Sequence, residues 1–210
     1  MMLASRAVDI RQVFGESPQV LAEILQDGVN LAVWQRRLAA QVEDFAALLL
    51  SLGQPMADER VIDVDEREMP VLPGLLSGAA DLHGYEGFVA DVAWLVSAYT
   101  CLLGARRVGL RLRVLEGTMC PRFHVDHVPL RLLTTYAGKG SEWLEEGRID
   151  RTALPHAPPP VDNIQCLQVG AVALLKGEKW LGNEGAGLIH RSPLTGAGEL
   201  RLLLSLDWLA

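Results

Sequence analysis

The periodicity of the apolar residues changes near Gly104, and this change constrains the fold more strongly than any other feature of the sequence. Before Gly104, apolar side chains recur at helical spacing in three segments, at residues 18–26, 38–52 and 84–104. After Gly104, residues 108–115 alternate apolar and charged side chains, as a half-buried strand does. The sequence therefore predicts an α+β fold in which helices come first and strands dominate later.

The length and composition predict one compact domain. With 210 residues, of which 50% are hydrophobic, the chain can bury a full core. We expect a single domain spanning residues 1–210, in which residues 1–105 form a mainly helical layer and residues 106–210 form the strand-rich core. Further strands are expected at residues 30–34, 61–64, 169–176, 188–190 and 200–208.

The segment His124-Val125-Asp126 predicts a metal site. In an extended strand, residues i and i+2 point to the same face, so His124 and Asp126 can bind one ion together. His190 lies on another expected strand and would supply the third ligand. Two imidazoles and one carboxylate are the ligand set of the facial triad, which holds Fe(II) and leaves the opposite positions open. His124, Asp126 and His190 are therefore the candidate metal ligands.

Two neighbouring side chains offer alternatives within this site. His127 directly follows Asp126 and should face the opposite side of a strand, but it would replace Asp126 if the segment leaves the strand early. Cys120 precedes His124 closely, and one cysteine with two histidines could bind zinc. Cys101 and Cys166 lie in apolar segments and are expected to be small core residues.

Further motifs surround these ligands. After the His-x-Asp motif come Arg131-Leu132-Leu133-Thr134-Thr135-Tyr136 and Gly138-Lys139-Gly140, and later Gly170, His190, Pro193, Gly196 or Gly198, and Arg201. In these features the chain from His124 onward resembles the Fe(II)/2-oxoglutarate-dependent dioxygenases, most closely their prolyl-hydroxylase-like branch. The resemblance covers roughly the C-terminal half of the chain and implies a double-stranded β-helix core, a cupin-like jelly roll, to which the helical pattern of residues 1–105 would add an N-terminal helical layer. It also implies Fe(II), 2-oxoglutarate and the hydroxylation of an unidentified small-molecule or peptide substrate.

The same resemblance suggests how 2-oxoglutarate would be held. Arg201 would pair with its distal carboxylate, a task that suits an always-charged guanidinium with a fixed fork of donors. The step from His190 to Arg201 is longer than is usual in that family, so Arg191 is a rival for the same role. Tyr136 would either point into the barrel toward the co-substrate or fill the core.

A second resemblance keeps zinc as the alternative metal. The whole chain resembles an uncharacterised family of bacterial proteins that carry this His-Val-Asp segment and are associated with zinc-limitation gene clusters. The second functional hypothesis is therefore a cupin-like metal-binding protein without oxygenase activity, linked to zinc homeostasis. Both hypotheses use the same three ligands, and Arg201 distinguishes them, because only the oxygenase needs it to bind 2-oxoglutarate.

The charge of the chain limits its partners. A formal net charge of -7 and a pI near 5.2 argue against a nucleic-acid-binding surface, since phosphate contacts need a basic patch. The densest basic stretches lie at residues 106–107 and 111–113, where alternation across a strand would expose them to solvent. The oligomeric state stays open, with a homodimer as one option.

The cysteines and the apolar segments predict a cytoplasmic protein. Three cysteines without regular spacing favour a reducing compartment. Residues 1–6 lack the apolar stretch of a secretion signal. The apolar run at residues 88–103 contains Asp91 and is shorter than a membrane span requires, so we expect a buried helix there and no membrane partner.

Overall fold

The chain forms a mixed, sheet-rich fold with few helices. The computed structural model describes residues 9–65, 67–148, 150–152, 154 and 159–209. Two α-helices, α1 (Ala40–Ser51) and α2 (Tyr85–Leu103), correspond to the helices expected at residues 38–52 and 84–104. Three short 3-10 helices accompany them, η1 (Pro18–Leu25), η2 (Ser77–Ala79) and η3 (Val161–Asn163).

Seven strands form the large sheet, in the spatial order β1-β2-β8-β5-β10-β4-β3. Their bounds are β1 (Arg11–Gly15), β2 (Val29–Trp34), β3 (Met56–Asp63), β4 (Arg107–Glu116), β5 (Leu130–Ala137), β8 (Val172–Lys176) and β10 (Leu200–Trp208). All neighbouring pairs are antiparallel except β1 and β2, which are parallel. A small antiparallel sheet has the order β7 (Ile164–Cys166), β6 (Glu142–Leu144), β9 (His190–Arg191).

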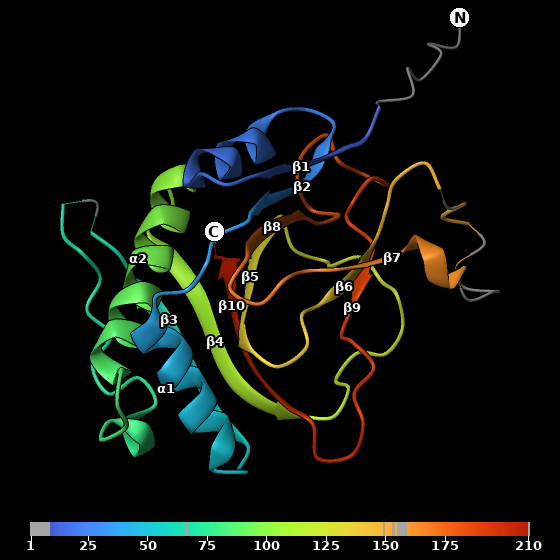
Figure 1. Ribbon diagram of the computed structural model, residues 1–210. Helices are drawn as coiled ribbons and strands as arrows, with labels where there is room; N and C mark the ends of the chain where they lie inside the picture. Colours follow the sequence, from blue (N-terminus) through green and yellow to red (C-terminus); the bar gives the residue numbers. More distant parts are fainter. Residues whose placement is uncertain (1–8, 66, 149, 153, 155–158, 210) are drawn as a thin grey trace, which may run out of the picture.

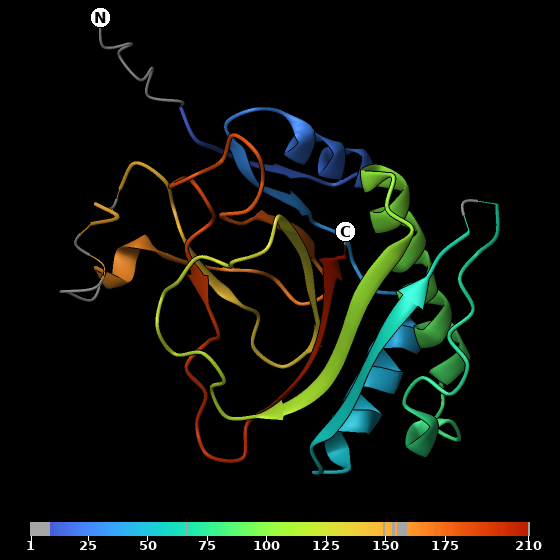
Figure 2. The ribbon, with the colours of Figure 1, turned by 180° about the vertical axis from the view of Figure 1, so that it is seen from behind.

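The large sheet separates two apolar clusters. On one face it packs against α1 and α2, as Figure 1 shows, through side chains such as Phe45, Phe88 and Val92. On the other face Leu133, Ala173 and Leu203 pack against Trp143 of the small sheet. Figure 2 shows from behind how β3 and β4 run alongside the helices while the small sheet lies away from them. The chain therefore has a helical layer, a large sheet and a small sheet.

Alternation along β10 decides what faces the small sheet. Leu202, Leu204 and Leu206 join the cluster on the helix side. Arg201, Leu203 and Ser205 point the other way and line a pocket between the two sheets. Because successive side chains of a strand point to opposite faces, the strand buries leucines beneath the helices and presents two polar side chains and one leucine to the pocket.

The first 105 residues do more than form a helical layer. They also supply β1, β2 and β3, three strands of the large sheet, so the expected division at residue 105 is not a division between layers. The strands expected at residues 30–34 and 61–64 belong to β2 and to the longer β3. β1 was missed in the sequence because it is a short edge strand whose pattern of burial is irregular.

The cysteine environments differ from the sequence expectation. Cys101, Cys120 and Cys166 are free and exposed, so the expectation that Cys101 and Cys166 are core residues was wrong. Cys101 lies near the end of α2, which buries other side chains against the sheet. Cys166 lies on β7, an edge strand of the small sheet. An apolar neighbourhood in sequence therefore did not determine which face of each element these thiols occupy.

By length and composition, α2 is the one helix within the described ranges that could cross a membrane, with a mean hydropathy of 1.3. In this fold it packs against the large sheet instead. Phe88, Val92, Leu95 and Tyr99, which lie at helical spacing, are buried there. The buried helix expected from the sequence thus corresponds to α2.

Candidate metal centre

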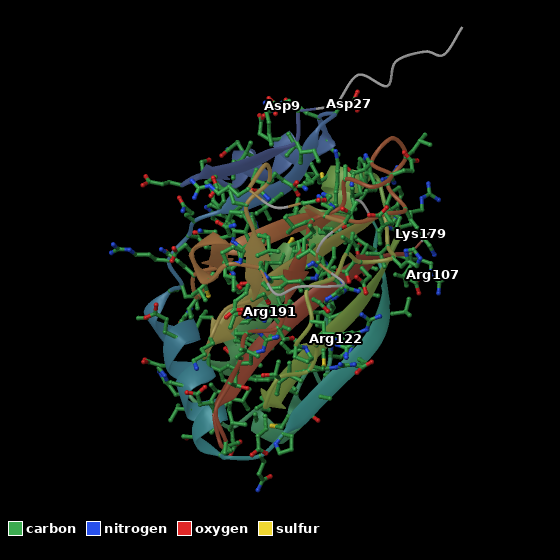
Figure 3. The ribbon with its side chains drawn as sticks, turned by 90° about the vertical axis from the view of Figure 1, so that its right-hand side faces the viewer. Asp9, Asp27, Arg107, Arg122, Lys179 and Arg191 are labelled. Atoms are coloured by element: carbon green, nitrogen blue, oxygen red, sulfur yellow. The ribbon has the colours of Figure 1, made fainter. Side chains whose placement is uncertain are left out.

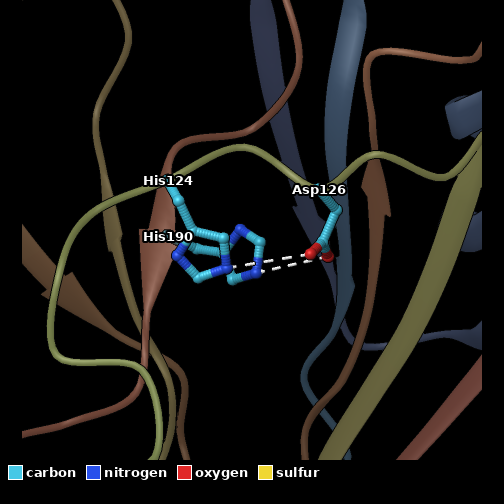
Figure 4. Close-up of side chains that lie close together, drawn as sticks. All are labelled: His124, Asp126 and His190. Carbon is cyan, nitrogen blue, oxygen red and sulfur yellow. Dashed lines mark ion pairs between the residues drawn. The ribbon is translucent and has the colours of Figure 1, made fainter.

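His124, Asp126 and His190 lie together, and the two histidines also line the pocket between the sheets. One potential ligand atom from each lies within 4.8 Å of the others. The Nε2 atom of His190 is 3.4 Å from Asp126 Oδ2, and the Nε2 atom of His124 is 3.7 Å from Asp126 Oδ1. Figure 4 shows both rings directed toward the carboxylate. The structure thus brings together the three side chains that the sequence singled out.

The ligand-bearing segment is not a regular strand. His124 and Asp126 lie in the connection between β4 and β5, where His124 forms an isolated bridge with His190 at the start of β9. Each of the two residues donates its backbone N–H to the carbonyl oxygen of the other at 3.0 Å. The expectation of a strand at residues 124–126 was therefore wrong, but the bridge keeps the segment close to His190.

Two glycines allow this connection to approach its neighbours closely. A Cβ atom at Gly177 would lie 2.1 Å from the Val128 carbonyl oxygen and 2.6 Å from that of Asp126. A Cβ atom at Gly187 would lie 2.2 Å from a methyl carbon of Val125. A side chain at Gly177 would collide with backbone oxygen atoms and one at Gly187 would displace the Val125 side chain, so both glycines permit the close approach of this segment. No pattern in the sequence marks either glycine for this role.

The hydrogen bond at Nδ1 of each imidazole determines which ring nitrogen carries the proton in the neutral form. His124 Nδ1 lies 2.9 Å from the Arg122 carbonyl oxygen, and His190 Nδ1 lies 3.2 Å from that of Leu188. A carbonyl oxygen only accepts, so each Nδ1 carries the proton when the ring is neutral. Each Nε2 then has a free lone pair directed toward Asp126. Metal-binding histidines are commonly oriented in this way by their other nitrogen.

Asp126 is held as a carboxylate. Arg131 donates Nη1–H to both of its oxygen atoms, at 2.8 Å each. Burial raises the pKa of Asp126, but the hydrogen bond and charge that His190 supplies when its Nε2 is protonated, together with the charges of Arg131 and of protonated His124, outweigh burial and keep that pKa below its usual value. The cluster therefore offers two imidazole nitrogens and one ionised carboxylate, a donor set that fits a divalent transition metal.

The adjoining pocket has a volume of about 140 Å³ and is rich in arginine. Its lining consists of Arg111, Arg113, Met119, Cys120, His124, Arg131, Leu133, Ser141, His190, Arg191, Ser192, Arg201, Leu203 and Ser205. No acidic side chain is among these lining residues. A cavity of this kind is suited to a small anionic ligand that reaches the metal ligands from the pocket.

Arg201 is the most deeply buried of these arginines, with 2% of its surface exposed. Its guanidinium donates to the Lys139 carbonyl oxygen and the Ser192 hydroxyl, both at the long distance of 3.4 Å. No carboxylate pairs with it within the described part of the chain. Burial lowers the pKa of Arg201 to about 10. A buried guanidinium with spare donors is a binding group for an anion.

Arg191, the rival of Arg201, already has a carboxylate partner. Its Nε–H donates to Glu142 Oε2 at 2.7 Å, and its guanidinium lies over the Phe123 ring at 4.4 Å from the centroid. Figure 3 labels Arg191 on the face of the molecule that carries the small sheet. Because Glu142 neutralises Arg191, the geometry favours Arg201 as the anion-binding residue.

The alternative metal ligands lie outside the cluster. His127 is exposed, whereas Asp126 is buried with its carboxylate facing the two imidazoles. Cys120 lines the pocket but does not belong to the ligand group formed by the described residues. The arrangement therefore favours Asp126 over His127 and a His-Asp-His set over a set containing Cys120.

Tyr136 does not line the pocket. Its side chain lies on the helix side of β5, where it is 1% exposed and packs against Phe88 with ring centroids 4.8 Å apart. Its hydroxyl donates to Asp91 of α2 at 2.6 Å. The proposed contact with a co-substrate is contradicted by this position, and the core-filling alternative is the correct one. Alternation along β5 places Arg131 and Leu133, not Tyr136, on the pocket face.

Replacing Tyr136 by phenylalanine tests this correction. We expect a loss of about 1–2 kcal/mol in the free energy of unfolding, because one buried hydrogen bond to Asp91 disappears. We expect no change in the affinity for 2-oxoglutarate or any other ligand of the pocket. Urea unfolding and calorimetric titration measure the two quantities, and a weakened ligand affinity with unchanged stability would contradict the assignment.

Three further pocket residues were not assigned to the site from the sequence. Arg111 and Arg113 were expected to be solvated, but they line the pocket and pair with Asp207 and Glu59, respectively. Arg131 appeared only as part of a motif, yet it contacts Asp126 directly. Alternating charges on a strand signal that one face is polar, but they do not reveal whether that face meets solvent or a second sheet.

The fold and the site define a sheet-rich protein with a candidate His-Asp-His metal centre in an arginine-lined pocket. Within that class, the chain belongs to the family described as "Protein of unknown function (DUF1826)", whose model matches residues 15–207. Comparison with curated proteins gives no match.

Comparison with solved structures gives a match at a TM-score of 0.50, which shares the general fold at low sequence identity, and others with lower scores. A bsmA homolog from Methylobium petroleophilum has 14% identity and a TM-score of 0.50, and the match covers 97% of this chain and 96% of that one. A prolyl-4-hydroxylase from Pseudomonas putida has 12% identity and a TM-score of 0.48, covering 90% and 96%. An oxidoreductase of the 2OG-Fe(II) oxygenase family from Burkholderia pseudomallei has 14% identity and a TM-score of 0.43, covering 94% of both chains.

Proposed function

We propose that this protein is an Fe(II)/2-oxoglutarate-dependent oxygenase built on a double-stranded β-helix core. One observation carries the proposal. Two of the candidate ligands, His124 and His190, line the same pocket as Arg201, a buried guanidinium that has no carboxylate partner among the described residues, and Asp126 completes the ligand group beside them. A metal-ligand set beside an unpaired cation fits a metal and an anionic co-substrate together.

The three ligands would hold the metal from one side. His124 and His190 would bind through Nε2, since each Nδ1 is engaged with a backbone carbonyl oxygen. Asp126 would bind through its carboxylate, which stays ionised in this environment. When bound, Fe(II) with 2-oxoglutarate and dioxygen supplies the oxidising power for attack on a substrate C–H bond, and the protein contributes positioning.

Arg201 would bind and orient the distal carboxylate of 2-oxoglutarate. Its guanidinium presents parallel N–H donors to a carboxylate, and its burial on β10 makes that interaction stronger than it would be in water. Ser192, whose hydroxyl lies 3.4 Å from Arg201 Nη2, would complete the polar contact. Leu133 and Leu203 belong to the apolar part of the lining and would limit access of water to the bound co-substrate.

The proposal extends to the substrate class and the cellular location. A small molecule or an accessible peptide side chain could approach the pocket, and substrate choice in such a fold resides in the surrounding loops. We propose a cytoplasmic protein without a nucleic-acid or membrane partner, in keeping with the acidic net charge of -7.

An anaerobic titration tests the function. Metal-free protein is titrated with Fe(II) and then with 2-oxoglutarate, while the weak visible charge-transfer band of the chelate is recorded. We expect the band in the wild type and in Arg191→Ala. In Arg201→Ala we expect Fe(II) binding to persist while 2-oxoglutarate affinity falls at least about thirtyfold, because a charged partner in a buried pair is lost.

Two results would decide against an oxygenase. If no band forms in the wild type but zinc binds tightly, the protein is the alternative, a cupin-like metal-binding protein. If the band forms equally well in Arg201→Ala, the pocket does not hold 2-oxoglutarate in the proposed orientation. Circular dichroism of each variant checks that the fold is retained.

A further inference from the structure

A chain of alternating charges leads away from the candidate metal centre. Arg131 contacts both oxygen atoms of Asp126 through Nη1, at 2.8 Å each. Its Nε–H donates to Asp207 Oδ1 at 2.7 Å and its Nη2–H to Asp207 Oδ2 at 3.2 Å. Arg111 then donates to Asp207 Oδ2 at 2.7 Å. The order is thus Asp126, Arg131, Asp207, Arg111.

The sheet fixes this order. Arg131 on β5 and Asp207 on β10 are directly opposite each other in the antiparallel pairing. Asp207 also contacts Arg111 across the next strand pair, which joins β10 to β4. Cross-strand neighbours keep their side chains within contact distance, so the spacing of Arg131, Asp207 and Arg111 does not depend on loop positions, whereas Asp126 lies in the connection between β4 and β5.

Burial strengthens the electrostatic interactions of these charges with a bound cation. The exposed fractions of the side chains are 10% for Asp126, 19% for Arg131 and 5% for Asp207. Interactions between charges are several-fold stronger in such an environment than in water. A divalent cation that binds Asp126 must share the carboxylate with the Arg131 donor and must approach a fixed positive charge. Asp207 offsets part of that charge, since it also pairs with Arg111, whose own charge is more screened because 42% of its side chain is exposed.

We propose that Arg131 and Asp207 form a counter-charge pair that sets the metal affinity of the centre. Arg131 is a positioning residue that holds Asp126 in place and weakens its attraction for the cation. Asp207 limits this weakening because it neutralises Arg131 from the other side. The inference rests on the metal site of the proposed function, and it assigns the level of affinity to residues that do not bind the metal themselves.

Opposite shifts in metal affinity are the expected result. Arg131→Met removes the competing donor and the positive charge, so the dissociation constant for Co(II) should fall about tenfold or more. Asp207→Asn leaves Arg131 uncompensated while preserving the side-chain shape, so the constant should rise about tenfold. The dissociation constant of the double variant should lie near the wild-type value, because the two substitutions together remove a positive and a negative charge that compensate each other.

The measurement is calorimetric titration of the metal-free proteins with Co(II), accompanied by thermal melting in the metal-free state. Arg107→Met is the matched control. It changes the net charge as Arg131→Met does, but it breaks an exposed ion pair with Asp63, so the affinity should stay within about twofold of wild type. A merely structural role for Arg131 would lower stability without producing affinity shifts of opposite sign.

The outcomes separate this inference from the proposed function. If the wild type binds no Co(II), the metal centre itself is wrong. If the wild type binds Co(II) but both single variants weaken binding, or neither changes it, only the counter-charge role is overturned. If Arg131→Met does not fold, Asp207→Asn alone tests the inference. Weaker Co(II) binding in Asp207→Asn supports the counter-charge pair, and unchanged or tighter Co(II) binding overturns it.

Discussion

Replacing His190 by alanine is expected to lower the affinity for Fe(II) or Co(II) by more than about hundredfold, because one of the three ligands is removed. The alternative ligands His127 and Cys120 lie outside the ligand group and cannot replace it. The folded state should survive. The backbone hydrogen bonds between His190 and His124 do not depend on the imidazole, and Asp126 keeps its contacts with Arg131. Calorimetric titration under anaerobic conditions measures the affinity.

The matched control for this variant is His127→Ala. His127 is also a histidine next to the cluster, but it is exposed and lies outside the ligand group. We expect wild-type metal affinity in His127→Ala. If His127→Ala loses the metal while His190→Ala retains it, the ligand set is wrong, and the neighbouring histidine has the role that the geometry gives to His190.

The periodic elements were predictable from the sequence. Helix α2 and strand β10 extend over nearly the same residues as the segments expected at 84–104 and 200–208. Both are long, so the apolar periodicity repeats often enough to identify the element. The short elements were harder. The helix expected at residues 18–26 is the 3-10 helix η1, and of the strand expected at residues 188–190 only His190 lies in the two-residue β9. Neither segment is long enough for its period to define its geometry.

The side chains of the candidate centre could be chosen from the sequence because their chemistry is distinctive. Two histidines and an aspartate near a basic residue suggest a metal site whatever the local backbone, which explains why their convergence was anticipated although residues 124–126 do not form a strand. Their support could not be anticipated. The role of Arg131 depends on cross-strand pairing with β10, and that of Gly177 depends on the approach of the Val128 carbonyl oxygen.

The placement of Tyr136 shows the same limit. A tyrosine next to polar residues on a strand fits a pocket or a core equally well. The decision depends on Asp91, which lies far away in sequence on α2 and accepts the hydrogen bond of the tyrosine hydroxyl. Only the packing of α2 on the large sheet brings these residues together, so no local pattern could assign Tyr136 to the helix side.

The same Asp91 should be the most sensitive position for stability outside the candidate metal centre. It accepts two hydrogen bonds from Arg36, at 2.5 and 2.9 Å, and one from Tyr136, at 2.6 Å. Arg36 also donates to the Gly170 carbonyl oxygen at 2.9 Å. The network therefore joins α2, β5 and the segments before α1 and before β8.

We expect Asp91→Ala to reduce the free energy of unfolding by about 3–5 kcal/mol, because it leaves the Arg36 guanidinium buried without its counter-charge. This is a large share of the roughly 5–15 kcal/mol that stabilises a typical domain. Urea unfolding at fixed pH measures the change. Asp63→Ala is the control, since the pair of Asp63 with Arg107 is exposed and its loss should cost less than about 1 kcal/mol.

The metal-binding measurement then separates stability from function. Asp91 contacts groups on the helix side of the large sheet, whereas His124, Asp126 and His190 lie at the pocket on its other side. Under conditions where Asp91→Ala remains folded, we therefore expect its Co(II) affinity to equal that of the wild type. A parallel loss of metal affinity would mean that the two faces of the sheet are coupled, and that the helical layer takes part in positioning the candidate ligands.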